Sequence, residues 1–332
     1  MAADDQGSPL FALDLKILSL NISGLRNKTC FLKQIIYKYK PDVICLQETN
    51  ISDKYYENKA LYDLGLDKNN CVFNYPSTKS NGTAIFCTSH DIKINYSFCL
   101  DEGRAIILKV EKGKIHYTIV NVYAPTNQSQ RPDYFINLFS HLENIQNRQN
   151  LIIAGDFNIT LQDIDILGEK GSQRIGRAEL QSIVDTFDLN DAFRIKHPNA
   201  IETTFENKTH NRSSRLDRIY FLKGIPLLNA FHIASTLDFT DHKGILAYFS
   251  NSNNTRSFDK KYIHWKFNDS LLDNPEFTAA IKETIHSNSF DCDASNVLRK
   301  FDSLNTIFKR ISVRFSSKIE KQRNERLEFL NF

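Results

Sequence analysis

The chain has 332 residues, of which 41% are hydrophobic and 24% are charged, and its formal net charge is +3. This composition is ordinary for a soluble globular protein, and the length suffices for one large domain with an appendage. The sequence contains no run of about twenty apolar residues, so a membrane span is not expected. Because the net charge is nearly balanced, any attraction to a polyanion must come from local patches of charge.

The amino terminus and the cysteines indicate the compartment. Residues 1–13 are expected to form a short flexible lead, without the basic and apolar regions of a secretory signal. The six cysteines are scattered without a CxxC pair, which favours buried free thiols over a disulfide framework or a zinc site. The sequence therefore predicts an intracellular protein, nuclear or cytoplasmic, that is not secreted.

Short strands alternate with a few helices between residues 14 and 250. Helices are predicted at 28–39, 132–147 and 177–187, where apolar residues recur at helical spacing. Strands are predicted at 16–21, 42–49, 71–75, 83–88, 104–110, 115–122, 151–154, 202–205, 218–221 and 244–249. This order predicts an α/β fold of two packed sheets with helices outside them.

One of these strands leads into GDFN (155–158). The run LIIA (151–154) has no polar alternation, so both of its faces are expected to be buried in an inner sheet. Gly155 permits a tight turn, and Asp156 and Asn158 would lie on one side of an extended segment because they are two residues apart. By itself this segment fits an Asp/Asn turn as well as a functional site.

Other predicted strands also end in polar side chains. If the strands lie side by side, these residues converge on one rim of the sheets, which predicts a site there. The set comprises Asn21, Glu48, Tyr123, Asp156, Asn158, Asp217, Asp241 and His242.

This set resembles the endonuclease/exonuclease/phosphatase superfamily over residues 14–250. The matching pieces are LN (20–21), LQET (46–49), NVYAP (121–125), GDFN (155–158), SRLD (214–217) and TDH (240–242). The resemblance implies a four-layer α/β sandwich of two mostly antiparallel sheets flanked by helices.

Within that superfamily, the chain is similar to the apurinic-type endonuclease domain of LINE (non-LTR) retrotransposon polyproteins. The similarity lies in DAFRIKHP (191–198) followed by TTF (203–205), and in HWKFNDSLL (264–272). There are two departures. Thr240 stands where the family usually has Ser, and Asp165 is followed by Ile166 where Asp-Arg is common.

The resemblance and the chemistry of phosphodiester hydrolysis together imply a role for each residue. Glu48 is the expected principal ligand of Mg²⁺, with Asn21 alongside and Asp241 as a further ligand, and Mn²⁺ is an expected substitute. In catalysis, Tyr123 would bond the phosphate, Asp156 would orient water or handle a proton, and Asn158 would hold the water or the phosphate. His242, paired with Asp217, would donate to a phosphoryl oxygen.

The polar connection at 206–214 would, by resemblance, be a hairpin that lies in the minor groove of double-stranded DNA and sets target choice. The alternative is a flexible surface loop. The substrate-binding residues expected on and around it are Thr204, Lys208, Arg212, Ser214, Arg215 and Thr240.

Beyond residue 250 the sequence changes character. Residues 251–263 are predicted to be a linker, and residues 264–332 a mostly helical extension that becomes basic from Lys309. Those charges fit a solvated helix face better than a nucleic-acid contact, and the partners considered for this extension are RNA and further polyprotein domains.

Other functions share many of these residues. An abasic-site repair endonuclease has the same catalytic pieces, and an RNA deadenylase is not excluded by them. An inositol phosphatase is disfavoured, because the late Pro-Ala-Trp-x-Asp-Arg motif is absent. A non-catalytic relic that binds nucleic acid is the alternative of a different class, although no catalytic position is lost.

Overall fold

The computed structural model describes residues 14–76, 81–100, 103–145, 150–167, 174–207, 212–233, 239–250 and 269–287, with residues 308, 311, 312 and 315. The chain divides into two compact units, Met1–Arg256 and Ser257–Phe332. The predicted lead and linker lie outside the described residues, and their boundaries stay predictions.

The first unit contains two six-stranded sheets. One sheet pairs β1 and β2 in parallel, and its other neighbouring strands are antiparallel. Its strands, in spatial order, are β14 (Leu227–Ile233), β15 (Gly244–Phe249), β1 (Leu15–Asn21), β2 (Val43–Gln47), β4 (Thr83–Cys87) and β3 (Cys71–Asn74).

The second sheet is built in the same way, with β7 and β8 as its parallel pair. Its spatial order is β10 (Leu189–Asp191), β13 (Asp217–Leu222), β8 (Leu151–Asp156), β7 (Ile115–Tyr123), β6 (Ala105–Lys112) and β5 (Ile92–Leu100). A small third sheet joins β11 (Phe205–Asn207), β12 (Arg212–Ser214) and β9 (Ile166–Leu167).

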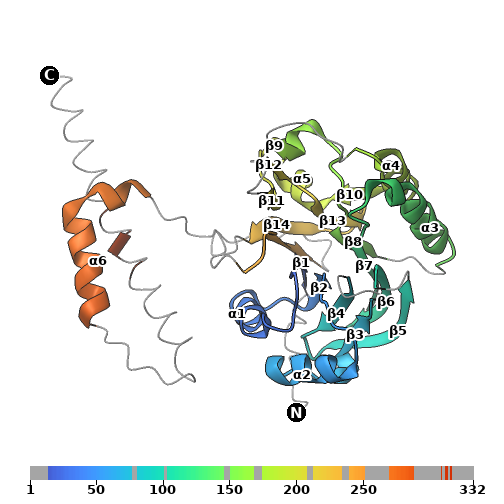
Figure 1. The fold of residues 1–332 in the computed structure, drawn as a ribbon, viewed down its shortest axis with the longest axis horizontal. Helices are drawn as coiled ribbons and strands as arrows, with labels where there is room; N and C mark the ends of the chain where they lie inside the picture. Colours follow the sequence, from blue (N-terminus) through green and yellow to red (C-terminus); the bar gives the residue numbers. More distant parts are fainter. Residues whose placement is uncertain are drawn as a thin grey trace, which may run out of the picture. The chain divides into compact units, whose positions relative to one another are not determined.

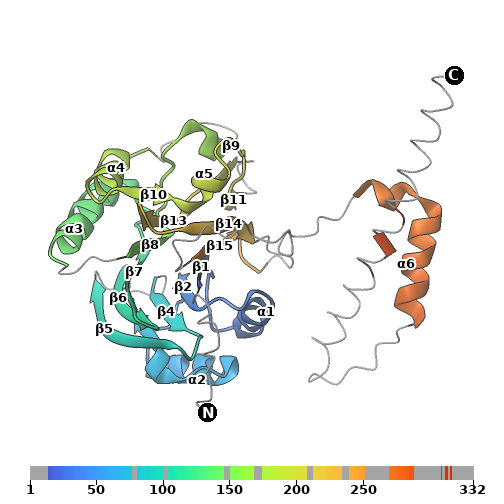
Figure 2. The same cartoon turned by 180° about the vertical axis from the view of Figure 1, so that it is seen from behind.

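Helices cover the outer face of each large sheet (Figures 1 and 2). The helices α1 (Thr29–Tyr39) and α2 (Lys54–Leu64) share a hydrophobic core with the first sheet, and α3 (Arg131–Glu143) and α4 (Arg177–Thr186) share another with the second. A third core fills the space between the sheets. The predicted four-layer sandwich of mostly antiparallel sheets is therefore confirmed.

Strand alternation directs the polar strand ends into the space between the sheets. In β8, Ile152 and Ala154 belong to the core between the sheets, whereas Leu151 and Ile153 face the helices. Asp156 continues the first series, because residues two apart on a strand share a face. The same alternation places Asn21 at the end of β1 and Tyr123 at the end of β7 on the inner side.

Gly155 is required by the close approach of β7. A Cβ atom at this position would lie 1.9 Å from the backbone oxygen of Val122, and the φ angle is +151°. No side chain fits there, so the glycine before Asp156 lets the two parallel strands pair in register up to Tyr123 and Asp156.

Several elements were not predicted from the sequence. These are α2, β5, β14 and the short β9, β10 and α5 (Ala192–Lys196). The strand predicted at 202–205 is instead β11, which begins at Phe205 and pairs with β12. None of the described helices is long and apolar enough to cross a membrane.

The second unit is helical where it is described. A single turn of 3₁₀ helix at Asp269–Asp273 precedes α6 (Pro275–Ser287). Phe277 of α6 is buried and its ring packs edge-on against Phe315, with 5.5 Å between the ring centroids. The basic residues predicted from Lys309 onward lie outside the described residues.

Candidate active site

The polar strand ends surround one cavity in the first unit. Its volume is about 310 Å³, and charged, polar and apolar residues from widely separated parts of the chain share its wall. It is lined by Glu48, Thr126, Gln128, Arg131, Asp156, Asn158, Phe205, Leu216, Asp241 and His242.

Asn21 links the two carboxylates on one side of this cavity. Its Nδ2 donates to Glu48 Oε1 and to Asp156 Oδ2, both at 3.0 Å, and its Oδ1 accepts the backbone N–H of Ser23 at 3.0 Å. The Tyr123 hydroxyl also donates to Glu48 Oε1, at 2.7 Å. Asn21 and Tyr123 therefore both act on Glu48, and Asn21 turns its nitrogen rather than its oxygen toward the carboxylates.

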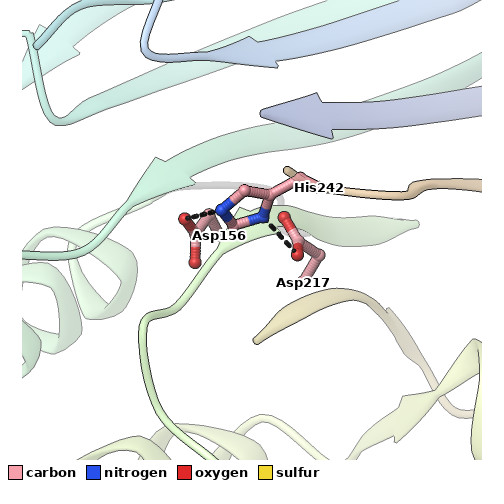
Figure 3. Close-up of side chains that lie close together, drawn as sticks. All are labelled: Asp156, Asp217 and His242. Atoms are coloured by element: carbon pink, nitrogen blue, oxygen red, sulfur yellow. Dashed lines mark hydrogen bonds and ion pairs between the residues drawn. The ribbon is translucent and has the colours of Figure 1, made fainter. Parts of the chain in front are cut away.

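His242 lies between two buried carboxylates (Figure 3). Its Nδ1 is 2.8 Å from Asp217 Oδ2, and its Nε2 is 3.9 Å from Asp156 Oδ2. Phe205 packs against the imidazole, with 5.0 Å between the ring centroids. Asp217 thus sets the orientation of the ring, and Nε2 faces the carboxylate of Asp156.

The environment shifts the pKa values of both groups. Burial alone lowers the pKa of His242, but the Asp217 carboxylate, its hydrogen bond and Asp156 raise it to about 10. Burial and the nearby charge of Asp217 raise the pKa of Asp156 to about 7, against the opposing effect of His242. An imidazolium at neutral pH therefore stands beside a carboxyl group that titrates near neutrality.

Two residues of the cavity wall have left-handed backbones. The φ angle of Glu48 is 51° and that of Asn158 is 52°, a region that residues other than glycine seldom occupy. At Asn158 this turn lets the backbone N–H donate to Asp156 Oδ1 at 2.9 Å, while Nδ2 donates to the Ala124 oxygen at 2.9 Å. Strained backbone of this kind is found where side chains must be aimed.

Two of the predicted substrate-binding residues, Thr204 and Thr240, form hydrogen bonds to backbone groups, and a third, Ser214, is buried. Thr204 is fully buried, and its hydroxyl accepts the backbone N–H groups of Leu216 and Asp217 at 3.0 and 3.1 Å. Ser214 is also fully buried. The hydroxyl of Thr240, which is half-buried, donates to the Asn21 oxygen at 2.9 Å. The side chains of Thr204 and Ser214 are buried in the free protein, and their expected contact with substrate stays a prediction.

Arg215 is likewise buried, in an ion cluster centred on Asp165. Its guanidinium donates to Asp165 from Nε at 2.8 Å and to Asp191 from Nη1 at 2.8 Å. Arg218 donates to Asp165 from Nη2 at 3.1 Å, and Arg194 also donates to this carboxylate. The guanidinium of Arg215 is 1% exposed and already paired, and its expected contact with substrate stays a prediction.

Replacing Asp165 with alanine is expected to lower the free energy of unfolding by about 3–5 kcal/mol, because three guanidinium groups lose their shared carboxylate inside the protein. Chemical denaturation measures this. The control is Asp163→Ala in the same 3₁₀ turn: its pair with Arg174 is exposed, so a loss below about 1 kcal/mol is expected. Equal losses in the two variants would contradict the role of the buried cluster.

The same cluster predicts an acid dependence. Burial alone raises the pKa of Asp165, but Arg218 and Arg215 lower it well below its ordinary range. A carboxyl group with a lowered pKa in the folded state stabilises the protein above its unfolded pKa of about 3.9 and loses that contribution as the pH falls further. The difference in stability between wild type and Asp165→Ala should accordingly shrink below about pH 4.

The structure brings together most, but not all, of the predicted residues. Glu48, Asp156, Asn158, Asp241 and His242 line the cavity, and Asn21, Tyr123 and Asp217 contact members of that set. Lys208 and the side chain of Arg212 lie outside the described part of the chain.

Some cavity residues were missed in the sequence: Thr126, Gln128, Arg131, Phe205 and Leu216. The signal for three of them was their position between NVYAP (121–125) and the helix predicted from residue 132. Phe205 and Leu216 belong to quoted motifs, but apolar residues there gave no reason to expect a place in the cavity wall.

The family model of the endonuclease/exonuclease/phosphatase family matches residues 18–242. The chain belongs to this family. The matched range includes every residue described above that lines the cavity, and members of the family generally depend on a divalent metal.

Curated relatives include a transposon protein and a nuclease. The Transposon TX1 uncharacterized 149 kDa protein of Xenopus laevis is 27% identical over 329 residues, which cover 96% of this chain and 24% of that protein. The chain thus spans about a quarter of the length of this transposon protein. The predicted resemblance is confirmed. Exodeoxyribonuclease III of Haemophilus influenzae is 28% identical over 236 residues, covering 62% of this chain and 86% of that enzyme.

Solved structures of similar fold include an AP endonuclease from Archaeoglobus fulgidus and one from Leishmania major. Each superposes with a TM-score of 0.60 at 19% identity. The matches cover 71% of this chain and 99% of the first protein, and 72% and 88% for the second. At this identity they show a common fold.

The donor atoms around the cavity suit a hard divalent cation. Asp156, Asp217 and His242 bring ligand atoms within 4.8 Å of one another. His242 already forms a hydrogen bond with Asp217, so these two side chains fit a pair that shares a proton better than they fit ligands of a metal ion. Glu48 and Asp241 offer further carboxylate oxygens on the cavity wall. Carboxylate oxygens are the ligands that Mg²⁺ and Mn²⁺ prefer.

Proposed function

We propose that the chain is a magnesium-dependent endonuclease that nicks one strand of double-stranded DNA by attack of water on a phosphodiester bond. The observation that carries the proposal is the single cavity in which His242, held by Asp217, faces Asp156 beside Glu48 and Asn158. Family membership and the nuclease among the relatives support the same reaction.

The reaction requires charge neutralisation, an oriented water molecule and help for the leaving oxygen. Glu48 and Asp241 would hold the cation. Asn21 would act by orienting Glu48, because its Oδ1 is engaged by Ser23. When bound, Mg²⁺ (or Mn²⁺) would neutralise charge on the phosphoryl oxygens.

Asp156 and Asn158 would handle the attacking water. The Asp156 carboxyl, with its pKa raised to about 7 by burial and by Asp217, is suited to accept a proton at neutral pH. Asn158 N–H and Asn21 Nδ2 fix both of its oxygens in place. Asn158 would then position the water or the phosphate at the cavity wall.

His242 would donate from Nε2 to a phosphoryl oxygen. A charged donor strengthens its hydrogen bond as negative charge builds on that oxygen. The Asp217 hydrogen bond at Nδ1 leaves Nε2 for this contact. Tyr123 donates to Glu48 and would position that carboxylate. For its hydroxyl to donate to the phosphate instead, as expected from the sequence, the bond to Glu48 would have to break.

The decisive test is nicking of supercoiled plasmid by the full chain. Conversion to the open circular form in Mg²⁺, abolished by chelation, is the expected result. Failure to nick while DNA is still bound would favour the non-catalytic relic.

The contribution of residues 264–332 to RNA binding, which we include in the proposal, is tested by comparing RNA retention with and without that segment.

The abasic-site repair endonuclease is the second candidate, and Phe205 and Leu216 favour it because they give the cavity an apolar wall beside His242. A repair enzyme should cut a duplex with one abasic site far faster than intact plasmid. A retrotransposon-type endonuclease should cut both. The ratio of the two rates separates these candidates. Nuclear rather than cytoplasmic localisation, seen by microscopy, would be consistent with both enzymes.

Replacing the segment between β11 and β12 is expected to move the nicked positions without abolishing activity. Residues 208–211 join two strands of the small sheet, and β11 also pairs with the segment that carries His242. Exchange for an unrelated polar sequence of equal length should leave the rate within about tenfold, because phosphate grip rather than chemistry changes. Sequencing of nicked ends measures the pattern.

The matched control for this exchange is Lys114→Ser. Lys114 lies in the exposed β6–β7 turn, at the opposite end of β7 from Tyr123. It removes a basic residue without touching the cavity, so the nicking pattern should stay as in wild type. An unchanged pattern after exchange of 208–211 would count against a role in target choice.

A further inference from the structure

The cavity is acidic for a site that must receive a DNA phosphate. Three carboxylates line it, from Glu48, Asp156 and Asp241. Among its lining residues, cationic side chains come only from His242 and Arg131. His242 is already committed to Asp217 and the reaction, so Arg131 is the remaining permanent positive charge on the wall.

Arg131 is held rigidly by two backbone oxygens. It is the first residue of α3 and is 4% exposed. Its Nε donates to the Pro125 oxygen at 2.9 Å and its Nη2 to the Thr126 oxygen at 2.8 Å. Asn158 holds the preceding Ala124 oxygen, so the wall segment and the guanidinium are fixed relative to the candidate site.

The third nitrogen of this guanidinium has no hydrogen-bond partner in the described structure. Nη1 of Arg131 is buried and unpaired. Buried donors in folded proteins are nearly always paired, and a charged donor without a partner is especially unfavourable. The Asp156 carboxylate attracts the guanidinium, which partly offsets the lowering of the Arg131 pKa by burial. A residue that lines the cavity therefore carries a buried donor without a partner in the described structure.

We propose that Arg131 binds a non-bridging phosphate oxygen of the DNA strand through Nη1, while Nε and Nη2 keep holding the cavity wall. The inference rests on the proposed function, since it takes DNA as the ligand. Nη1 is shielded in the free protein, so the phosphate must displace the atoms that cover it. It then provides a charge-assisted hydrogen bond to a donor that had none. Lysine lacks the fork needed for both tasks.

The test is a coupling experiment between Arg131 and individual phosphates. Fluorescence anisotropy measures the affinity of the full chain for a short duplex in EDTA, and for duplexes in which one linkage at a time is an uncharged methylphosphonate. Wild type should lose about 10- to 100-fold in affinity at one linkage near the nick position. Arg131→Gln should bind the unmodified duplex about 10- to 100-fold more weakly than wild type does. Replacing that linkage with methylphosphonate should then cause no additional loss of affinity in this variant.

Arg177→Gln is the matched control. Arg177 is also the first residue of a helix, α4, and donates to the Thr160 oxygen from Nε at 2.8 Å, but it does not line the cavity. The Arg177→Gln variant should lose the same affinity as wild type does at every methylphosphonate linkage. Arg131→Lys, which keeps the charge, should bind with intermediate affinity, and thermal unfolding of each variant verifies that it is folded.

Salt dependence gives a second measurement. Loss of one phosphate contact should reduce the slope of log affinity against log salt concentration by about 0.9 for Arg131→Gln, which loss of a purely structural bond would not do. The proposal would be overturned if Arg131→Gln lost as much affinity as wild type does at every methylphosphonate linkage. If Arg131→Gln does not fold, the same outcome for Arg131→Lys would overturn it. Wild type that binds and shows the coupling without nicking would refute the proposed function alone, whereas no DNA binding would refute both.

Discussion

Replacing His242 with alanine is expected to lower the rate of plasmid nicking about 10²- to 10⁴-fold. The imidazole is buried between Asp156 and Asp217, and the carboxylates raise its pKa to about 10 despite the lowering effect of burial. It is therefore protonated at neutral pH, and its Nε2 is available to a phosphoryl oxygen whose negative charge grows in the transition state. Initial rates of conversion of supercoiled to open circular plasmid measure the effect.

A second buried histidine provides the control for this substitution. His232 on β14 stacks on Phe193, with 4.0 Å between ring centroids, and its Nδ1 is 3.2 Å from Glu202. It does not line the cavity, so His232→Gln should affect stability without a comparable fall in rate. Nicking by His242→Ala within about threefold of wild type would refute a direct role in the reaction.

The partner carboxylate should show the same effect through the histidine. Asp217→Asn keeps the shape of the side chain but removes the charge that holds the imidazolium. His242 would then lose protons at lower pH, because burial alone lowers its pKa. The rate should fall in the same direction as for His242→Ala, which separates a paired histidine from one that is merely packed.

The inner strands and their polar ends were predictable because the signal is local. The apolar runs of β1, β2 and β8 are uninterrupted, and strand alternation alone decides that Asn21 and Asp156 point between the sheets. The geometry around Asn158 was not predictable in the same way. The spacing of two assumed an extended segment, whereas the φ angle of 52° turns Asn158 back so that its N–H bonds Asp156.

The unpredicted elements have weak periodicity for physical reasons. The strand β5 is at the edge of its sheet and most of its residues are exposed, so no apolar run marks it. Four of the eleven residues of the helix α2 are buried, and its ends define it: Asp53 caps its first turn, and Gly65 ends it in a left-handed conformation. The signals at both ends are short-range.

The ion cluster around Asp165 shows what sequence motifs do not contain. The Asp-Arg pair common in the family is Asp165-Ile166 here. The structure instead supplies three guanidinium groups to Asp165 from Arg194, Arg215 and Arg218. Because these arginines lie 29 to 53 residues away in sequence, only the folded chain reveals that Arg215 stabilises the site from within.

Replacing Glu48 with alanine is expected to lower the rate of nicking at least as much as loss of His242, by about 10²-fold or more. Glu48 is half-buried at the cavity, and its Oε1 accepts hydrogen bonds from Asn21 and Tyr123. These donors orient the carboxylate, and the remaining lone pairs of its oxygens are available to a cation. Rates at increasing Mg²⁺ concentration measure the effect, and partial rescue by excess Mg²⁺ would support the ligand role.

Glu48→Gln separates orientation from charge. The amide oxygen of glutamine can still accept from Asn21 and Tyr123, so the local hydrogen bonds survive while the negative charge is lost. If Glu48 holds a cation, Glu48→Gln should be nearly as slow as Glu48→Ala, and calorimetry should show weakened Mg²⁺ binding without any DNA present. If Glu48 only positions its neighbours, the glutamine variant should nick at close to the wild-type rate with unchanged Mg²⁺ affinity. That second result would move the cation site to Asp241 and Asp156, the other carboxylates on the cavity wall.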